Sequence, residues 1–482
     1  MLFNSLEFAL FLPIVFALYW FLPFKRLRGQ NALVVVASYV FYGWWDWRFL
    51  GLILLSTLTD YAMGLWMGAT AEQRKRKRLL WVSLGLNLGL LGFFKYFNFF
   101  VDSFTTAFTF FGVAIQPNTL KIILPVGISF YTFQTLSYTI DVYKRSIEPT
   151  RDLVAFAAFV SFFPQLVAGP IERASNLLPQ FTQRRFFDRE KAVDGLRQIL
   201  WGLFKKVVIA DSCAKYANLI FDSSATLSGS TLVLGALFFT FQIYGDFSGY
   251  SDIAIGTSRL FGISLKRNFA FPYFSRDIAE FWRRWHISLT SWFRDYLYIP
   301  LGGSRGSLWM KIRNSLIVFC VSGLWHGANW TFVAWGLLNA LYFIPLLVTG
   351  RNKQHLGTVA EGRSLPSLKD FLSMLLTFTL TVLAWVFFRA TSIEHAFDYL
   401  SGIFSPSLFA YPAYSGMEES LITIVLCVLF MLVEWQGRTC HYAIEKLGLT
   451  WKRPYRWAFY YVLVLTIVLL GGEQQQFIYF QF

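Results

Sequence analysis

Two of the five histidines lie in surroundings where an imidazole could do chemistry. The first, His326, stands in residues 322–330, SGLWHGANW, about 12 residues into an apolar run that begins near Asn314. At about 1.5 Å per residue in a helix, the imidazole lies roughly 18 Å from the start of that run, near the middle of a membrane. An ionisable side chain at such depth is a candidate for function, and its glycine neighbours would admit a substrate or a second backbone. The alternative is a neutral histidine that is hydrogen-bonded inside a helix bundle.

The second candidate, His286, lies in a segment rich in arginine and tryptophan. Apolar residues recur there at steps of three and four, which predicts a helix with one aromatic face; they are Trp282, Trp285, Leu289, Trp292 and Tyr296. We expect this amphipathic helix to lie at the cytoplasmic interface of a membrane, with Arg283, Arg284 and Arg294 near its boundary. The arginines could attract the phosphates of a donor, or they could only hold anionic lipid headgroups. The sequence leaves the role of His286 open.

Two carboxylates in an apolar stretch are candidate supporting residues. Asp246 and Asp252 lie near the end of a predicted membrane span, residues 231–256. Carboxylates this close to lipid normally face protein or water. They could orient a histidine or shape a cavity, or they could form hydrogen bonds between helices.

The composition indicates the environment of these groups. Of the 482 residues, 55% are hydrophobic and 15% are charged, well below the roughly 25% charged content of soluble proteins. The 53 Phe, 23 Tyr and 18 Trp suit packed, lipid-facing and interfacial surfaces. A net charge of +15 would suggest nucleic-acid binding in a soluble protein, but here the basic residues gather in short loops between apolar runs. We therefore expect an all-α integral membrane protein that contacts lipids and binds no nucleic acid.

Apolar segments predict about 11 to 12 transmembrane helices, since a bilayer needs roughly 20 apolar residues per helix. The candidate spans are residues 6–24, 30–45, 49–69, 79–97, 121–141, 194–220, 231–256, 314–334, 336–350, 369–389, 419–434 and 455–471. The alternation of basic loops places residues 74–78 in the cytoplasm and both termini outside. Residues 153–170 are apolar but contain Pro164, Gly169 and Pro170, so a re-entrant or interfacial segment fits better than a straight span. Residues 1–482 are expected to form one membrane domain, because no internal repeat or linker is visible.

The four cysteines show neither close pairing nor other ligand types at metal-binding spacing; they are Cys213, Cys320, Cys427 and Cys440. We expect neither a disulfide framework nor a metal site.

The two histidine segments belong to an ordered set of motifs that is spread over almost the whole chain. The set comprises residues 124–131 (LPVGISFY), 163–171 (FPQLVAGPI), 283–303, 322–335 and 477–482 (FIYFQF). It resembles the membrane-bound O-acyltransferase family, in particular the bacterial branch of the alginate O-acetylation protein and its peptidoglycan O-acetylating relatives. A lone Trp-His-Gly would be weak, whereas the ordered set is highly specific.

The resemblance implies an acyltransferase with many helices around a central tunnel. His326 matches the family's principal catalytic histidine and His286 a second active-site residue, while Trp325 and Asn329 would support the tunnel. This branch usually passes acetyl groups outward to a separate extracytoplasmic acetyltransferase of the SGNH type, which modifies a polysaccharide such as alginate or peptidoglycan. We therefore expect a multi-pass protein of the bacterial inner membrane with such a partner.

The preferred mechanism uses acetyl-CoA as the cytoplasmic donor substrate and no permanently bound cofactor. His326 would deprotonate a hydroxyl that attacks the thioester, and His286 would orient a group or stabilise charge. An acetyl-histidine intermediate is an alternative route. Two rival functions are a transporter or flippase for a lipid-linked glycan or activated precursor, and a noncatalytic scaffold.

Overall fold

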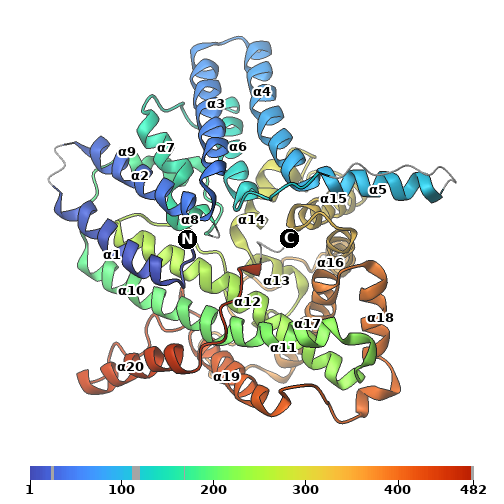
Figure 1. Cartoon of the computed structure of the whole chain (residues 1–482). Coiled ribbons are helices and arrows are strands. Elements are labelled where there is room, and N and C mark those ends of the chain that lie inside the picture. Colours follow the sequence, from blue (N-terminus) through green and yellow to red (C-terminus); the bar gives the residue numbers. More distant parts are fainter. Residues whose placement is uncertain (23–25, 111–119, 168, 479–482) are drawn as a thin grey trace. The chain divides into compact units, whose positions relative to one another are not determined.

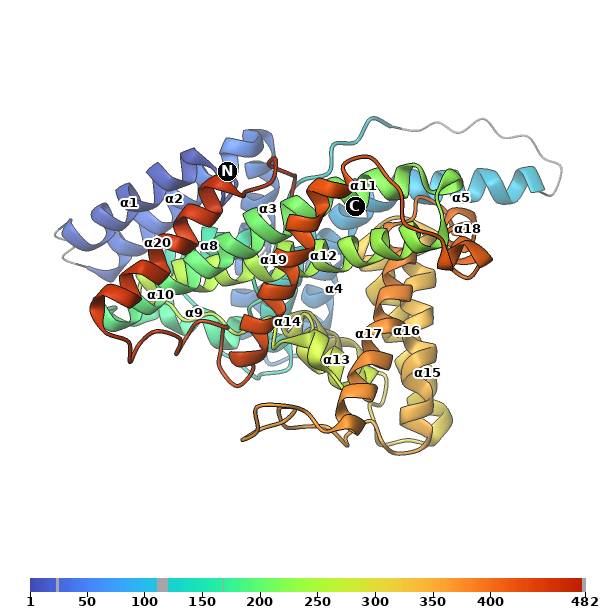
Figure 2. The same cartoon turned by 90° about the horizontal axis from the view of Figure 1, so that it is seen from below.

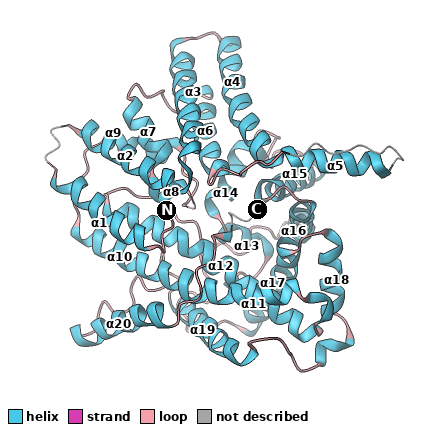
Figure 3. Cartoon of the chain, in the orientation of Figure 1, coloured by secondary structure: helices cyan, strands magenta, loops and turns pink. Residues whose placement is uncertain are grey.

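The computed structural model describes residues 1–22, 26–110, 120–167 and 169–478 of the chain. All regular secondary structure in these residues is helical, as Figures 1 and 3 show. The expectation of an all-α fold is confirmed. Residue 168 and residues 479–482, which belong to motifs named above, lie outside the described residues, as do residues 23–25 and 111–119.

Among the described residues, five helical stretches are long and apolar enough to cross a membrane: Leu27–Ala69, Gln73–Phe110, Gly229–Leu260, Trp330–Val348 and Leu368–Arg389. The helix Leu6–Phe21 is apolar but shorter. Each stretch corresponds to one or two of the predicted spans.

The chain divides into two compact units. The first comprises Met1–Ala192 with Thr257–Lys266, and the second comprises Val193–Gly256 with Arg267–Phe482. Two helices, α10 (Arg189–Leu203) and α12 (Gly229–Leu260), contribute residues to both units.

In the part of the first unit that the structure describes, nine α-helices form besides its share of α10 and α12: α1 (Leu6–Phe21), α2 (Leu27–Asp46), α3 (Leu50–Ala69), α4 (Gln73–Leu91), α5 (Phe97–Phe110), α6 (Ile128–Tyr143), α7 (Leu153–Ser161), α8 (Phe163–Leu166) and α9 (Ala174–Thr182). Helices α3, α4 and α6 pack together (Figure 1), and buried polar side chains join them. Asp60 accepts hydrogen bonds from the side chains of Ser83 (2.6 Å) and Asn87 (2.9 Å). The hydroxyl oxygens of Ser83 and Thr139 lie 3.0 Å apart, within hydrogen-bond distance. Interhelical bonds of this kind hold membrane helices together where no hydrophobic force acts between them.

The second unit contains, besides its share of α10 and α12, the helices α11 (Asp211–Asp222), α13 (Ile278–Arg284), α14 (Ile287–Phe293), α15 (Leu308–His326), α16 (Trp330–Val348), α17 (Leu368–Arg389), α18 (Ile393–Ile403), α19 (Met417–Gln436) and α20 (Arg453–Leu469). Helices α15 and α16 form an antiparallel pair that runs side by side in both Figure 1 and Figure 2. A side chain at Gly323 of α15 would collide with the carbonyl of Phe332, and one at Gly336 of α16 would collide with that of Phe319. The glycines thus permit close backbone approach, as the sequence around His326 led us to expect.

One predicted span and the predicted re-entrant segment are each divided between two helices. Residues 314–334 do not form one helix, because α15 ends at His326 and α16 begins at Trp330. The side chain of Asn329 starts the second helix by accepting a hydrogen bond from the Thr331 N–H at 3.0 Å. In residues 153–170, α7 ends at Ser161 and the short α8 begins with Pro164 in its first turn, which confirms that no straight helix forms there.

Candidate active site

The structure brings His286 and His326 together in the second unit. His326 is the last residue of α15, and His286 directly precedes α14. Their ring centroids are 6.4 Å apart. Both residues are buried, with His286 1% and His326 3% exposed. Two residues that the sequence singled out separately are therefore neighbours in one buried site.

Aromatic side chains enclose the two imidazoles. Trp325 lies 4.9 Å from His326 and 6.0 Å from His286, measured between ring centroids. Trp335 and Phe388 pack on His326 at 5.2 and 5.5 Å, and Phe247 packs on His286 at 4.6 Å. Burial among these rings lowers the pKa of His286 to about 3, because an imidazolium would lose its hydration there. His286 is consequently neutral at physiological pH.

The backbone turns sharply at His286. Its φ of 44° and ψ of 54° are in the left-handed region, which is uncommon for a residue other than glycine. Helix α13 ends at Arg284 and α14 begins at Ile287, so the single amphipathic helix predicted over Trp282 to Tyr296 is wrong. The loop before α13 causes the break: the carbonyl oxygen of Asn268 accepts the Ile287 N–H at 2.9 Å, and that of Arg284 accepts the Ala270 N–H at 2.9 Å.

Asn268 also bonds His286 through its side chain. Its Oδ1 atom lies 3.0 Å from Nδ1 of His286, and the same oxygen accepts hydrogen bonds from the Ser288 N–H (3.3 Å) and Ser288 Oγ (2.9 Å). The Nδ2 atom donates to Ser251 Oγ at 3.2 Å. Asn268 thus caps α14 and orients the imidazole. The sequence around Asn268 predicted neither role.

An apolar cavity of about 570 Å³ adjoins this site and carries positive charge. Its wall includes Trp282 and Ile287, the immediate neighbour of His286 in the chain, together with Arg283, Arg294 and Lys353. Arg283 donates to the carbonyls of Asn352 (2.8 Å) and His355 (2.7 Å) in the loop after α16. The exposed Arg294 pairs with Asp295 at 2.7 Å.

Arg284, the third arginine of the segment, does not line that cavity. It donates to Glu280 Oε1 at 2.8 Å and to the carbonyl oxygens of Ala270 and Gly357. Burial alone would raise the pKa of Glu280, but hydrogen bonds from Arg276 and the charge of Arg284 outweigh it and hold that pKa below its usual range. Arg284 therefore belongs to a buried ion cluster that fixes α13.

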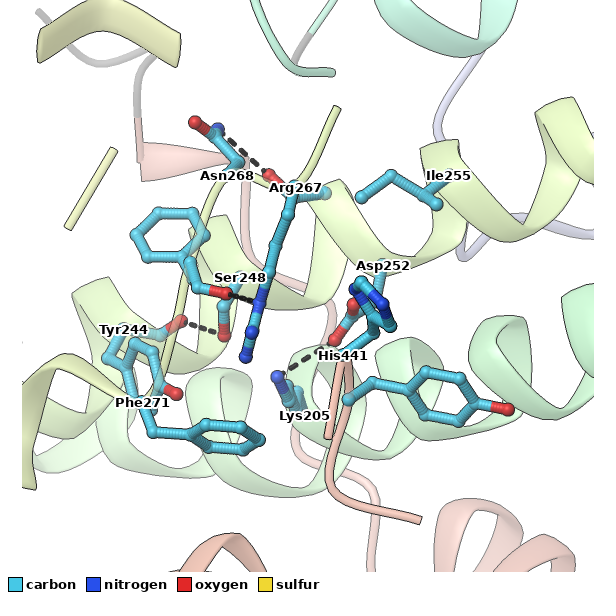
Figure 4. Close-up of a pocket in the computed structure, with 12 residues that line it drawn as sticks. Lys205, Tyr244, Ser248, Asp252, Ile255, Arg267, Asn268, Phe271 and His441 are labelled. Atoms are coloured by element: carbon cyan, nitrogen blue, oxygen red, sulfur yellow. Dashed lines mark hydrogen bonds and ion pairs between the residues drawn. The ribbon is translucent and has the colours of Figure 1, made fainter. Parts of the chain in front are cut away.

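The two carboxylates on α12 are paired with lysines. Figure 4 shows Lys205 with Asp252, whose Nζ and Oδ2 atoms are 2.8 Å apart. Lys206 bonds both Asp246 and Asp211 at 2.8 Å. The two adjacent lysines lie in a π-helical turn, Phe204–Ala210, and reach different carboxylates. This places Asp246 and Asp252 in ion pairs that join α12 to the turn.

The region of Figure 4 also contains a cavity of about 10 Å³, room for about one water molecule, lined by Arg267, Asn268 and Ser251 among others. It lies on the side of Asn268 that bonds Ser251, whereas His286 occupies the other. Asn268 therefore links the lysine–carboxylate region to the histidine site.

Comparison with known proteins identifies the fold and its general activity. Residues 39–386 match the model of the membrane-bound O-acyltransferase family. The chain belongs to this family. It is 43% identical over 409 residues to the "Probable alginate O-acetylase AlgI" of Azotobacter vinelandii, covering 84% of this chain and 78% of that protein. A protein of the same name from Pseudomonas putida is 38% identical over the full length of both chains. The "Peptidoglycan O-acetyltransferase" of Helicobacter pylori is 34% identical over 100% of this chain and 98% of its own.

These matches confirm the resemblance noted in the sequence, and they establish that the chain is a multi-pass membrane O-acyltransferase. Within this acyltransferase, residues 283–303 and 322–335 supply the two histidines of the buried site. Asn329 caps α16 through its Oδ1 atom, and its Nδ2 atom donates to the Thr391 carbonyl at 3.1 Å. Trp325 contacts both imidazoles.

Sequence reasoning missed three residues of the site and its surroundings. Lys205 and Lys206 could have been noticed, because two adjacent lysines in an apolar run need buried counter-charges. Asn268 offered a weaker signal, a single amide between Arg267 and Phe269. Its importance arises from tertiary contacts alone.

Proposed function

We propose that this acyltransferase takes an acetyl group from acetyl-CoA in the cytoplasm and passes it across the bacterial inner membrane for O-acetylation of an extracytoplasmic polysaccharide. The observation that carries the proposal is the juxtaposition of two buried histidines, 6.4 Å apart, with a basic apolar cavity that reaches Ile287. A thioester needs both parts: a dry site with an imidazole for acyl transfer, and an approach that tolerates an anionic carrier.

The cavity suits the donor in size and charge. A volume of about 570 Å³ lies in the range of small-molecule sites, and its lining is mainly apolar. Arg283, Arg294 and Lys353 provide cations for the phosphates of CoA, while the apolar wall around Trp282 suits the acyl-bearing arm. These contacts support Arg283 and Arg294 as donor-binding residues and add Lys353 to them.

The proposed chemistry places His326 as the base. The acceptor hydroxyl oxygen attacks the thioester carbonyl carbon, its proton passes to the imidazole of His326, and the C–S bond breaks. The departing CoA thiolate then takes the proton from the imidazolium. An ester forms and free CoA returns to the cytoplasm, so no carrier is exported.

The final acceptor is a polysaccharide, to which a separate extracytoplasmic acetyltransferase of the SGNH type would pass the acetyl group. The relatives named for alginate and peptidoglycan acetylation support a glycan as the final acceptor. A protein that moved a glycan without chemistry would not require His326, which separates this proposal from a transporter or flippase.

Purified protein, radiolabelled acetyl-CoA and a purified extracytoplasmic acetyltransferase of the SGNH type provide the test. We expect label to reach the partner or the glycan with the wild type and to fall at least 100-fold with His326→Ala, while thermal stability in detergent is maintained. His395→Ala is the matched control, because this partly exposed histidine bonds Ser224 at 3.1 Å on another helix and should leave transfer unchanged. Wild-type transfer by His326→Ala would remove His326 from the mechanism.

A further inference from the structure

The protonation state of His286 can be read from the atoms around Asn268. Three groups converge on one side-chain atom of Asn268: the Ser288 N–H, Ser288 Oγ and His286 Nδ1. A backbone N–H can only donate, so the atom that faces it is the amide oxygen and not the amide nitrogen. The oxygen can only accept, and Nδ1 of His286 must therefore carry a hydrogen.

A neutral imidazole with hydrogen on Nδ1 has a lone pair on Nε2. This Nε2 atom is buried and has no hydrogen-bond partner among the residues that the structure describes. The ring that bears it lies against Trp325 and faces the His326 ring across 6.4 Å. A buried acceptor left without a donor is unfavourable, and it points to a ligand that supplies one.

The direction of this hydrogen bond limits what His286 can do. In this tautomer Nε2 cannot donate to a developing oxyanion, so charge stabilisation by a neutral His286 is not available. It can accept a hydrogen bond from an N–H or O–H group of a bound substrate. We propose that Asn268 is a positioning residue that holds His286 in the Nδ1–H tautomer, so that Nε2 accepts a hydrogen bond from a substrate N–H or O–H other than the hydroxyl whose proton passes to His326. That the bound molecule is an acyl-transfer substrate rests on the function proposed above, whereas the tautomer does not.

The choice of an amide over a carboxylate at position 268 has a chemical consequence. Aspartate would also accept from Nδ1–H and cap α14, but its charge would stabilise the imidazolium. Asparagine keeps the tautomer and leaves the ring neutral. The environment of Asn268 would accommodate the substitution, since Ser288 already donates to Oδ1 and the Ser251 hydroxyl can rotate to donate.

The test compares Asn268→Asp and Asn268→Leu with the wild type by two measurements. The first is ¹⁵N NMR of protein labelled at histidine, which reports the tautomer directly and is tractable because the chain has only five histidines. The second is the pH profile of the His286 ¹⁵N signals, recorded together with the rate of acetyl transfer. Ser392→Asp is the matched control: it places a carboxylate at the N-cap of α18, where Ser392 Oγ accepts the His395 N–H at 3.0 Å, and it contacts neither active-site histidine.

We expect the wild type and Asn268→Asp to show His286 protonated on Nδ1, and Asn268→Leu to shift it toward Nε2–H. Asn268→Leu should lower kcat at least 10-fold with little change in the KM for acetyl-CoA. Asn268→Asp should retain most of its activity at high pH, but the pH at which His286 becomes protonated in the ¹⁵N spectra should move upward by about 1 to 3 units, the range of a nearby opposite charge. A cap without a role in orientation would instead give Asn268→Asp the wild-type profile.

Three results would overturn the proposal: Nε2–H on His286 in the wild type, full turnover by Asn268→Leu despite a changed tautomer, or an unshifted pH profile for Asn268→Asp. If Asn268→Leu does not fold, Asn268→Asp still decides through its profile and spectrum. Failure of the proposed function is seen separately, as transfer by His326→Ala, and leaves the tautomer measurement unaffected.

Discussion

At the scale of single residues, the buried His286 couples the stability of the protein to pH. The pKa of its imidazole is lowered to about 3 by burial, whereas an unfolded histidine titrates near 6.5. Below about pH 6.5 the imidazole binds a proton in the unfolded chain but not in the folded site. The contribution of the neutral His286 to the free energy of unfolding is therefore fully present above that pH and declines as the pH falls toward 3. The loss at pH 5 is about 2 kcal/mol, from 1.5 pH units at about 1.36 kcal/mol each.

His286→Phe should remove this dependence. We expect the difference between its unfolding free energy and that of the wild type to change by about 2 kcal/mol in favour of the variant between pH 7 and pH 5, measured by denaturant titration in detergent. Phe269→Leu is the control, since it alters packing beside the ring, 6.5 Å away, but keeps the imidazole. Equal slopes for wild type and His286→Phe would show that the ring is not held neutral.

Substitution of the three arginines in residues 283–294 should have different effects on donor binding and on stability. Arg283 and Arg294 line the basic cavity, and losing one Arg–phosphate contact, worth roughly 1.5 to 3 kcal/mol, should raise the KM for acetyl-CoA about 10- to 150-fold. Arg284→Gln should instead lower stability, because it leaves the buried Glu280 with one cation fewer. Steady-state kinetics and melting curves on Arg283→Gln, Arg294→Gln and Arg284→Gln distinguish the effects. An unchanged KM for acetyl-CoA in both Arg283→Gln and Arg294→Gln would show that the donor does not bind in this cavity.

At the scale of elements, the periodicity of residues 282–296 correctly predicted buried aromatic positions, but it wrongly predicted one continuous helix where the structure has two. The aromatic residues do recur at helical spacing, and Trp285 and Leu289 are buried as a stripe would be. The interruption at His286 comes from hydrogen bonds to Asn268, a residue of a different loop. No pattern within the segment could report this, because the competing bonds are tertiary.

The same limit applies to the polar groups of α12. The sequence identified Asp246 and Asp252 as buried carboxylates but offered no way to choose their partners. Lys205 and Lys206, two adjacent residues of a π-helical turn, reach separate carboxylates. These pairings are tertiary contacts, so the local sequence around each aspartate could not report them.

The contact between α11 and α19 gives a prediction about packing. Cys213 and Cys427 are both buried, and their sulfur atoms lie 3.5 Å apart, so a shift of about 1.5 Å would reach disulfide distance. We expect the membrane-permeant oxidant diamide to join them. A protease site inserted between α16 and α17 would then yield fragments that stay together on a non-reducing gel.

Cys213→Ser or Cys427→Ser should release the two fragments after the same oxidation, whereas Cys320→Ser and Cys440→Ser should not. Separation of the fragments in the oxidised wild type, with free thiols still present, would contradict the packing of α11 against α19.

At the scale of the whole molecule, hydropathy and composition were sufficient for the class of fold. Apolar length predicts the stretches that the structure forms as long helices, such as Gly229–Leu260 and Leu368–Arg389, because each must satisfy its own backbone in lipid. Segments that line the active site deviate most, as in the break after His326. Irregular backbone is tolerated there because protein surrounds it, so the functional region is where apolar length alone loses accuracy.

The distribution of basic loops gives the last prediction, which concerns sidedness. Lys77 follows the third predicted span, Lys353 lies in the loop between α16 and α17, and Phe409 lies in the loop between α18 and α19. The positive-inside rule places both lysines in the cytoplasm and Phe409 outside. All three are exposed, with Phe409 at 89%, so single cysteines there should react with a maleimide.

In intact cells an impermeant maleimide should label Phe409→Cys only, and Lys77→Cys and Lys353→Cys should react only after permeabilisation. Acetyl-CoA should then slow the labelling of Lys353→Cys, which lines the donor cavity, but not that of Lys77→Cys. Labelling of Lys353→Cys from outside would reverse the topology and, with it, the side from which a cytoplasmic thioester could reach His286 and His326.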